Sequence, residues 1–217
     1  MVITKKATIP GCNIQINGRA LKQVEQFKYL GTLITQDGRC ETEVKARIAQ
    51  AKSAFVKMKS LLTNKSIGLE IRKKILRCYI EPILLYGCEA WTLTKKIIGY
   101  LEGAEMWFFR RMLRVAWSDK KSNLDVLKMT NAQRALIGKV QKRKSTLVGH
   151  IVRKERIENL IITGKMEGKR SRGRQRKKML DDVGNWLGMT KMTEMLEFAR
   201  RKEVWNDMIA HATRHGT

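Results

Sequence analysis

Residues 42–62 read TEVKARIAQAKSAFVKMKSLL, and the spacing of their apolar side chains decides the fold class. Apolar residues recur at alternating steps of four and three, which aligns them along one face of a helix of about six turns. These residues are Val44, Ile48, Ala51, Phe55, Met58 and Leu62. The outer faces are expected to carry the cations Lys45, Arg47, Lys52, Lys57 and Lys59. The stretch therefore predicts a long amphipathic helix.

The same spacing recurs downstream of this stretch. One helix should begin near Leu69 and reach Pro82, where the missing amide hydrogen ends or kinks it. Residues 97–115 and about 190–212 predict further helices. Most of the chain is therefore expected to be helical.

Polar residues mark the beginnings of two further helices. Ser122 or Asn123 can cap a short helix, and Asn131 can cap a longer one. The longer helix should turn the apolar Leu136, Val140, Leu147 and Ile151 inward. Its outward-facing cations are candidates for nucleic-acid contact, namely Lys139, Lys142 and Arg143.

The first forty residues follow a different pattern. Residues 13–16 alternate, and Asn17-Gly18 follows them, a dipeptide suited to the positive backbone angles of a type I′ turn. Two more apolar stretches flank Gly31 and end at the turn dipeptide Asp37-Gly38. The predicted fold class is therefore mainly α, a helical bundle with a small N-terminal antiparallel β-hairpin unit.

The charge of the chain restricts its partners. Its 217 residues include 45 Lys and Arg against 20 Asp and Glu, a formal net charge of +25. Such a charge repels itself unless an anion is near, so nucleic acid is the expected partner, with an anionic membrane face and an acidic protein as alternatives. No segment approaches the roughly 20 apolar residues of a membrane helix, and the N-terminus lacks the apolar stretch of a secretory signal. We expect a protein of the nucleus or cytoplasm.

Residues 164–178 carry the strongest local signal. Three glycines and eight basic residues occur there with almost nothing to bury. Guanidinium groups at alternate positions can make bidentate phosphate contacts along an extended segment. Neutralising about six phosphates would weaken binding about 10³-fold between 50 and 200 mM salt. The alternatives are a solvated charge run and a nuclear import signal. The candidate binding residues are Lys169, Arg170, Arg172, Arg174, Arg176, Lys177 and Lys178.

Signatures of catalysis and metal binding are missing from the sequence. Phosphate-loop, nucleophile-elbow and His-Glu-x-x-His patterns do not occur. Asp181-Asp182 is more simply explained as a counter-charge to Lys177 and Lys178 than as a metal-binding pair. We expect no resident cofactor.

Cysteine, histidine and aromatic residues have packing interpretations as well. Cys78 and Cys88 are expected to be buried thiols, and His150 a packed, hydrogen-bonded side chain. Base stacking needs an exposed ring beside positive charge, and Trp107, next to Arg110 and Arg111, is the best candidate. Core packing is the default for Trp91, Trp107, Phe108 and Phe109.

Five segments, in order, resemble non-LTR (LINE-type) retrotransposon reverse transcriptases, the last of them the RTE/BovB-like group. They are residues 27–35 (FKYLGTLIT), 84–93 (LLYGCEAWTL), 106–114 (MWFFRRMLR), 149–153 (GHIVR) and 168–176 (GKRSRGRQR). The resemblance implies the end of the palm in residues 1–40, a helical thumb in 41–163, a basic linker in 164–178 and a small helical region in 179–217. The family's catalytic carboxylates lie upstream of the first matching segment.

The resemblance also implies roles. A hairpin at this place in the family holds the primer end, which would put Phe27, Tyr29, Leu30 and Gly31 at a primer-grip-like site, while the thumb grips template–primer. The implied partners are RNA, DNA or an RNA–DNA hybrid, and this chain alone is expected to be inactive as an RNA-directed DNA polymerase. Mg²⁺ is expected only with the palm. The alternatives are a host-adopted protein-interaction module and a non-functional remnant of a truncated element.

Overall fold

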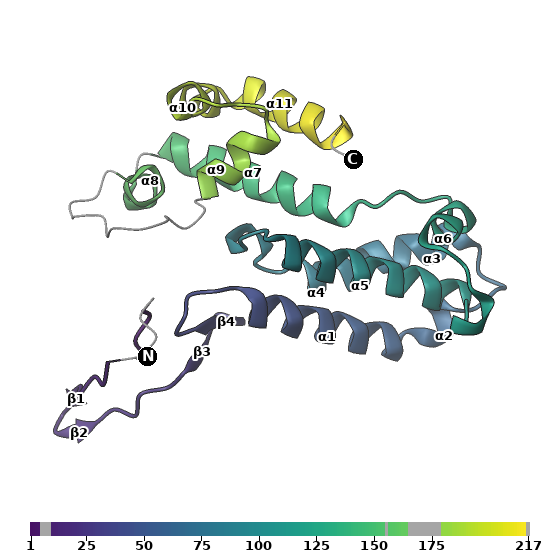
Figure 1. Cartoon of the computed structure of the whole chain (residues 1–217), viewed down its shortest axis with the longest axis horizontal. Helices are drawn as coiled ribbons and strands as arrows, with labels where there is room; N and C mark the ends of the chain where they lie inside the picture. Colours follow the sequence, from purple (N-terminus) through teal and green to yellow (C-terminus); the bar gives the residue numbers. More distant parts are fainter. Residues whose placement is uncertain (5–9, 155, 165–178, 216–217) are drawn as a thin grey trace. The chain divides into compact units, whose positions relative to one another are not determined.

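The computed structural model describes residues 1–4, 10–154, 156–164 and 179–215 (Figure 1). Helices form most of the described chain, and two antiparallel hairpins lie near the N-terminus, which confirms the predicted fold class. Contacts divide the chain into two compact units. Unit 1 consists of Met1–Gly87 and Met106–Val126, and unit 2 of Cys88–Glu105 and Leu127–Thr217. These units cut across the segment boundaries inferred from the sequence, which stay a prediction.

Both hairpins of unit 1 turn through two residues with positive φ. Strands β1 (Gln15–Ile16) and β2 (Arg19–Ala20) are joined by Asn17 and Gly18, at φ 51° and 75°, as the Asn-Gly dipeptide predicts. Strands β3 (Gln26–Tyr29) and β4 (Thr32–Thr35) are joined by Leu30 and Gly31, at φ 47° and 84°. In the second hairpin Tyr29 pairs with Thr32 across the turn.

The long helix predicted over residues 42–62 is present as two. Helix α1 (Glu41–Lys57) ends at Met58, whose backbone leaves helical geometry at φ −98° and ψ 14°, and α2 (Lys59–Leu62) follows. The predicted apolar face is largely confirmed, because four of its side chains are fully or nearly fully buried: Val44, Ala51, Phe55 and Leu62.

Pro82 does not end its helix. The helix is irregular just before it. Helix α3 (Leu69–Ile75) continues as a π-helical turn, η1 (Leu76–Ile80), and then as α4 (Glu81–Leu84). Pro82 falls in the first turn of α4, where a proline is tolerated because the first amides of a helix have no partner within it. The wider π turn before Pro82 accommodates the break in hydrogen bonding.

Helix α5 (Lys95–Leu113) contributes residues to both units, and α6 (Asn123–Thr130) follows it after the short 3₁₀ turn η3 (Trp117–Asp119). Ser122 caps α6, since its hydroxyl accepts from the Asp125 amide at 3.2 Å while the Asp125 carboxylate accepts from the Ser122 amide at 2.9 Å. The prediction of a cap at Ser122 or Asn123 is thereby confirmed in favour of Ser122.

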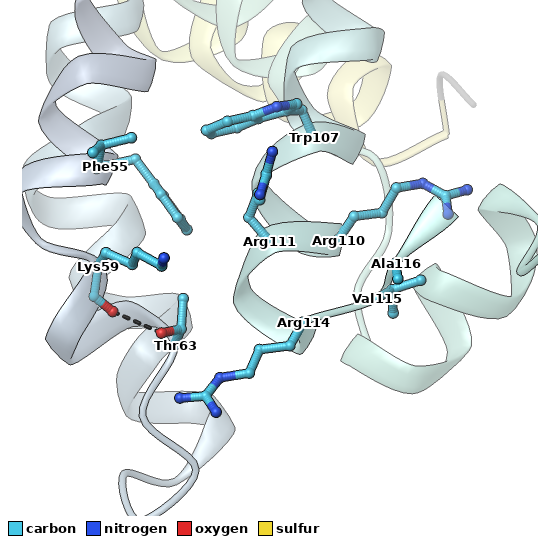
Figure 2. A pocket seen from close by; sticks show the side chains of 10 residues that line it. Phe55, Lys59, Thr63, Trp107, Arg110, Arg111, Arg114, Val115 and Ala116 are labelled. Atoms are coloured by element: carbon cyan, nitrogen blue, oxygen red, sulfur yellow. Dashed lines mark hydrogen bonds between the residues drawn. The ribbon is translucent and has the colours of Figure 1, made fainter. Parts of the chain in front are cut away.

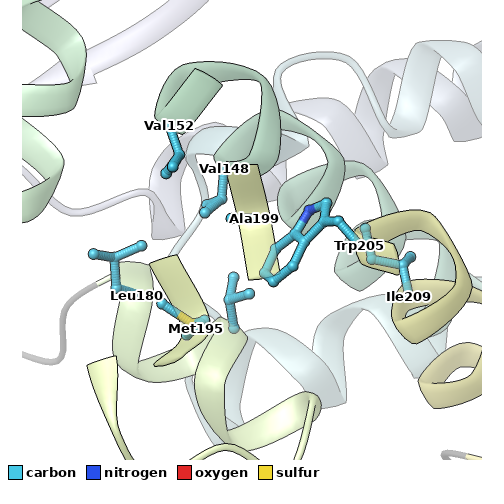
Figure 3. Close-up of a cluster of buried hydrophobic side chains, with 8 residues drawn as sticks. Val148, Val152, Leu180, Met195, Ala199, Trp205 and Ile209 are labelled. Carbon is cyan, nitrogen blue, oxygen red and sulfur yellow. The ribbon is translucent and has the colours of Figure 1, made fainter. Parts of the chain in front are cut away.

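Unit 2 is built around α7 (Leu136–Lys154). Its other elements are η2 (Cys88–Ala90), α8 (Ile157–Thr163), α9 (Met179–Trp186), α10 (Met192–Arg200) and α11 (Lys202–His215). Apolar side chains of α7, α9, α10 and α11 share one core (Figure 3), made of Val148, Val152, Leu180, Val183, Met195, Ala199, Trp205 and Ile209. The indole nitrogen of Trp205 donates to the Ser145 carbonyl at 2.9 Å.

The beginning of α7 differs from the prediction. Asn131, at φ 43°, directly follows α6 and lies too far upstream to cap α7. The amides of Ala135 and Leu136 instead donate to the Glu105 carboxylate at 3.0 and 3.2 Å. The cap therefore comes from α5, and local sequence could not reveal it.

An ion pair lies inside unit 2. Lys144 and Asp182 are 2% and 0% exposed, and their Nζ and Oδ2 atoms are 3.8 Å apart. The Lys144 ammonium also donates to the Trp91 carbonyl. Asp182 is therefore buried against a lysine of α7, while Lys177 and Lys178, the counter-charges expected for it, lie outside the described residues. Among the described helices, none is long and apolar enough to span a membrane.

Candidate nucleic-acid interface

A basic cavity opens in unit 1 between α1–α2 and the end of α5, with a volume of about 620 Å³. We call it the α1–α5 groove. Figure 2 shows Phe55 and Lys59 reaching toward it from one side and Trp107 and Arg111 from α5 on the other. Four cations and no carboxylate occur among the described residues that line it: Phe55, Val56, Lys59, Thr63, Trp107, Arg110, Arg111, Arg114, Val115 and Ala116.

Aromatic packing fixes one wall of the groove. The Phe55 ring contacts Trp107 edge-on, with centroids 5.4 Å apart, and also lies 5.6 Å from the Phe108 ring. The Trp107 ring has two cations near it, Lys52 Nζ at 5.1 Å and the Arg111 guanidinium carbon at 5.4 Å from its centroid. Trp107 is thus half-buried and already in cation–π contact, which leaves less of its ring for stacking than the sequence predicts.

The end of α5 adds an exposed cation in an unusual backbone conformation. Arg114 has φ 59°, the left-handed region that glycine favours at this position after a helix. The next amide, that of Val115, donates to the Arg110 carbonyl at 2.9 Å and closes the helix. A positive side chain here is favourable because the helix C-terminus carries partial negative charge.

The loop that follows is held by hydrogen bonds. Arg110 extends away from the groove (Figure 2) and donates to the Lys121 carbonyl at 2.9 Å and to Asn123 Oδ1 at 3.0 Å. The Asp119 carboxylate accepts from the Ala116 amide at 2.8 Å. Within this loop Trp117 is 99% exposed. Sequence reasoning missed Trp117, although its position outside any apolar helical face, between Arg114 and Lys120, was a usable signal.

The four predicted primer-grip-like residues lie together on the β3–β4 hairpin. Phe27, Tyr29 and Leu30 are 52%, 57% and 75% exposed, so the hairpin offers apolar surface. The turn is held from two sides, since the Arg47 guanidinium donates to the Gly31 carbonyl and the Tyr86 hydroxyl to the Leu30 carbonyl. The role of these residues at a primer end stays a prediction.

Arg47 corrects the expectation that it lies on an outer face of its helix. Its side chain is buried, pairs with Glu43 and stacks on the Tyr86 ring at 4.4 Å from the centroid. The helical spacing puts Arg47 on an outer face of α1, but the β3–β4 hairpin covers that face and buries the charge.

The three cations predicted on α7 belong to unit 2. Lys139 and Lys142 line a second cavity of about 580 Å³, together with Arg134, which pairs with Glu102 at 3.2 Å. Arg143 is exposed and interacts with the thiol of Cys88. The remaining candidates, Lys169, Arg170, Arg172, Arg174, Arg176, Lys177 and Lys178, lie outside the described residues. Nucleic-acid contact by either group stays a prediction.

Two further residue predictions are wrong and one is confirmed. Cys78 and His150 are exposed, because both lie on the solvent side of their helices. Cys88 is buried as predicted, and burial raises the pKa of its thiol to about 11, with the Glu89 charge acting in the same direction. Within the described part of the chain, no three His, Cys, Asp or Glu side chains gather closely enough to bind a metal ion.

Comparison with known proteins adds one relationship. No family model matches the chain, and no solved structure matches it either. An uncharacterized transposon-derived protein of Caenorhabditis elegans is 25% identical over 138 residues, which are 62% of this chain and 49% of that protein. The chain therefore spans about half the length of this curated relative. The chain is thus similar to a protein described as transposon-derived.

Proposed function

We propose that this protein binds nucleic acid as the thumb-like, C-terminal part of a LINE-type reverse transcriptase and grips template–primer. The observation that carries the proposal is the α1–α5 groove, where Lys59, Arg111 and Arg114 are exposed and no lining residue that the structure describes is acidic. Clustered cations without counter-charges are the electrostatic footprint of a phosphate-binding surface.

The chemistry of these side chains suits a phosphate backbone. The guanidinium group of arginine is planar and can donate two parallel hydrogen bonds to phosphate oxygens. Arg111 lies against the Trp107 ring, which reduces the rotamer freedom that the guanidinium loses on binding. Arg111 is therefore pre-positioned for phosphate binding, and Arg114 lies beside it at the end of α5.

The assignment to a reverse transcriptase has separate support. The transposon-derived relative agrees with an element origin, and two of the five segments that resemble LINE-type enzymes, residues 27–35 and 106–114, form the β3–β4 hairpin and the end of α5. The proposal assigns this chain binding and not catalysis, so purified chain with Mg²⁺ and template–primer should extend no primer.

Salt-dependent binding to an RNA–DNA hybrid tests the proposal. The slope of log affinity against log salt reports the number of neutralised phosphates, at about 0.9 per contact for duplex DNA. Replacing the groove cations Lys59, Arg111 and Arg114 by Gln should weaken binding and make the slope shallower by up to about three.

A matched control removes the same charge elsewhere in unit 1. Lys65, Lys74 and Arg77 are also exposed, and none of them lines the groove. Their replacement by Gln should change the slope much less than the groove variant does. Equal losses in the two variants would show that net charge, and not the groove, determines binding. No binding by the wild-type chain at low salt would reject the proposal altogether.

A further inference from the structure

Trp117 has no packing role. Its side chain is 99% exposed, whereas Trp91 and Trp205 are buried and Trp107 and Trp186 are half-buried. A tryptophan in a core normally buries about 150–250 Å² of surface. A fully solvated indole therefore contributes almost none of this burial free energy to folding. The fold therefore does not explain why a tryptophan occupies this position.

The backbone that carries Trp117 is nevertheless ordered by specific contacts. The η3 turn is closed by Asp119, whose carboxylate accepts from the Ala116 amide at 2.8 Å while its own amide donates to the Ala116 carbonyl at 3.3 Å. The Lys120 amide donates to the Trp117 carbonyl at 3.3 Å, and Arg110 ties the loop to α5 through the Lys121 carbonyl. These hydrogen bonds fix the turn that presents the indole to solvent. A ligand that contacts Trp117 therefore orders little additional backbone, which keeps the entropic cost of binding small.

Cations flank this indole along the chain, and the one carboxylate between them, that of Asp119, accepts from the Ala116 amide. Arg114 precedes the indole by three residues and Lys120 and Lys121 follow, while its neighbour Ala116 lines the α1–α5 groove. An exposed aromatic ring beside cations that follow a phosphate backbone is the arrangement by which proteins bind single-stranded nucleic acid. Every nucleobase offers a face for stacking, so such a site needs no sequence preference.

We infer that Trp117 stacks on an unpaired nucleobase, where a single strand leaves the duplex bound in the groove. The inference rests on the proposed function and deepens it: the groove contacts phosphates of the paired region, and Trp117 contacts a base beyond it. Lys120 and Lys121, which follow Trp117 in the chain, then supply positive charge for phosphates of the single strand.

Binding of three ligands to the purified 217-residue chain tests the inference. The ligands are a blunt RNA–DNA hybrid, the same hybrid with a short single-stranded template extension, and that extension made abasic. The abasic strand retains the phosphates and lacks the bases, so the ratio of the last two affinities isolates stacking. For the wild-type chain the extension with bases should bind on the order of tenfold more tightly than the abasic one. The same three ligands are then measured with variants of the chain.

Trp117→Ala should abolish this ratio and leave binding of the blunt hybrid unchanged, while Trp117→Phe should retain most of the ratio. Because the side chain makes no packing contact, neither variant should unfold. Tyr79→Ala is the matched control, since Tyr79 is an aromatic of unit 1 that is 61% exposed and does not line the groove. It should leave the ratio as in the wild-type chain.

The outcomes separate the two proposals. A wild-type chain that binds the blunt hybrid but does not distinguish bases from abasic sites overturns the inference and leaves the proposed function standing. A ratio that survives Trp117→Ala also overturns it, and would assign Trp117 to another contact such as a partner protein. A wild-type chain that fails to bind the blunt hybrid refutes the proposed function itself.

Discussion

Glu43 and Arg47 form an ion pair on successive turns of α1, with Oε1 and Nε 2.6 Å apart and less than a tenth of either side chain exposed. Each partner also holds the β3–β4 hairpin, because the other Glu43 oxygen accepts from the Leu33 amide at 2.7 Å and Arg47 donates to the Gly31 carbonyl. This pair therefore connects the long helix of unit 1 to the turn that carries the exposed apolar residues of the hairpin.

Arg47→Ala should destabilise the protein by about 3 kcal/mol. The substitution leaves the Glu43 carboxylate buried without its cation and releases the Gly31 carbonyl, and breaking one side of a buried pair typically costs this much. Urea unfolding followed by circular dichroism measures the free energy of unfolding.

The matched control for this variant lies on the same helix. Lys45 pairs with Glu41 at the same spacing and at 2.9 Å, but its side chain is 55% exposed. Lys45→Ala should cost less than about 0.5 kcal/mol, as exposed pairs at this spacing do. Similar losses in the two variants would mean that burial does not distinguish the pairs.

Arg114→Gly should make the protein more stable and a weaker ligand of nucleic acid. Glycine adopts φ 59° without the steric cost that arginine bears, so the free energy of unfolding should rise by up to about 1 kcal/mol. Loss of the guanidinium should reduce affinity for an RNA–DNA hybrid. Arg114→Gln removes the charge and keeps the strained backbone, so it should weaken binding without the gain in stability; a gain in both variants would contradict the backbone argument.

Gly149→Ala should destabilise unit 2 by about 2 kcal/mol or more. A Cβ at this position of α7 would lie 2.5 Å from Cδ1 of the buried Trp205 indole, so the ring or the helix must move. The measurement is thermal unfolding of the full chain.

Gly138, on the same helix, has no atom within 4 Å of an added Cβ, and Gly138→Ala should stabilise by about 0.5–1 kcal/mol through helix propensity alone. Equal effects of the two substitutions would exclude the Trp205 contact as the cause.

Alkylation at pH 8 should modify Cys12 and Cys78 and spare Cys88. The first two thiols are exposed, whereas burial raises the pKa of Cys88 to about 11 and keeps it in the unreactive thiol form. Mass spectrometry of the labelled peptides reads out the pattern, and labelling in denaturant should reach all four cysteines, Cys40 included. The same shift means that the stability contributed by the neutral thiol is intact below about pH 9 and is lost as pH rises toward 11. Rapid labelling of Cys88 in the folded protein would contradict its burial.

Local patterns in the sequence were sufficient for the fold class and for the positions of most helices, but not for the break at Met58, the π turn before Pro82 or the cap of α7. The buried faces of α1 and α5 and the Asn17-Gly18 turn follow from periodicity and from the backbone angles that each residue accepts, which are properties of neighbouring residues. The excess of cations, and with it the expectation of an anionic partner, also follows from the sequence alone.

Tertiary structure decided which polar residues are inside the fold and which apolar ones remain outside. Arg47, Lys144 and Asp182 are buried because a segment distant in sequence covers each of them and supplies a counter-charge or a carbonyl. Trp117 is exposed because no element covers the η3 turn in the described structure. Helical spacing shows which side chains share a face, but which faces meet depends on contacts between residues far apart in the chain. The α1–α5 groove arises from such contacts, because Phe55 and Lys59 face the arginines at the end of α5 only after α5 packs against α1.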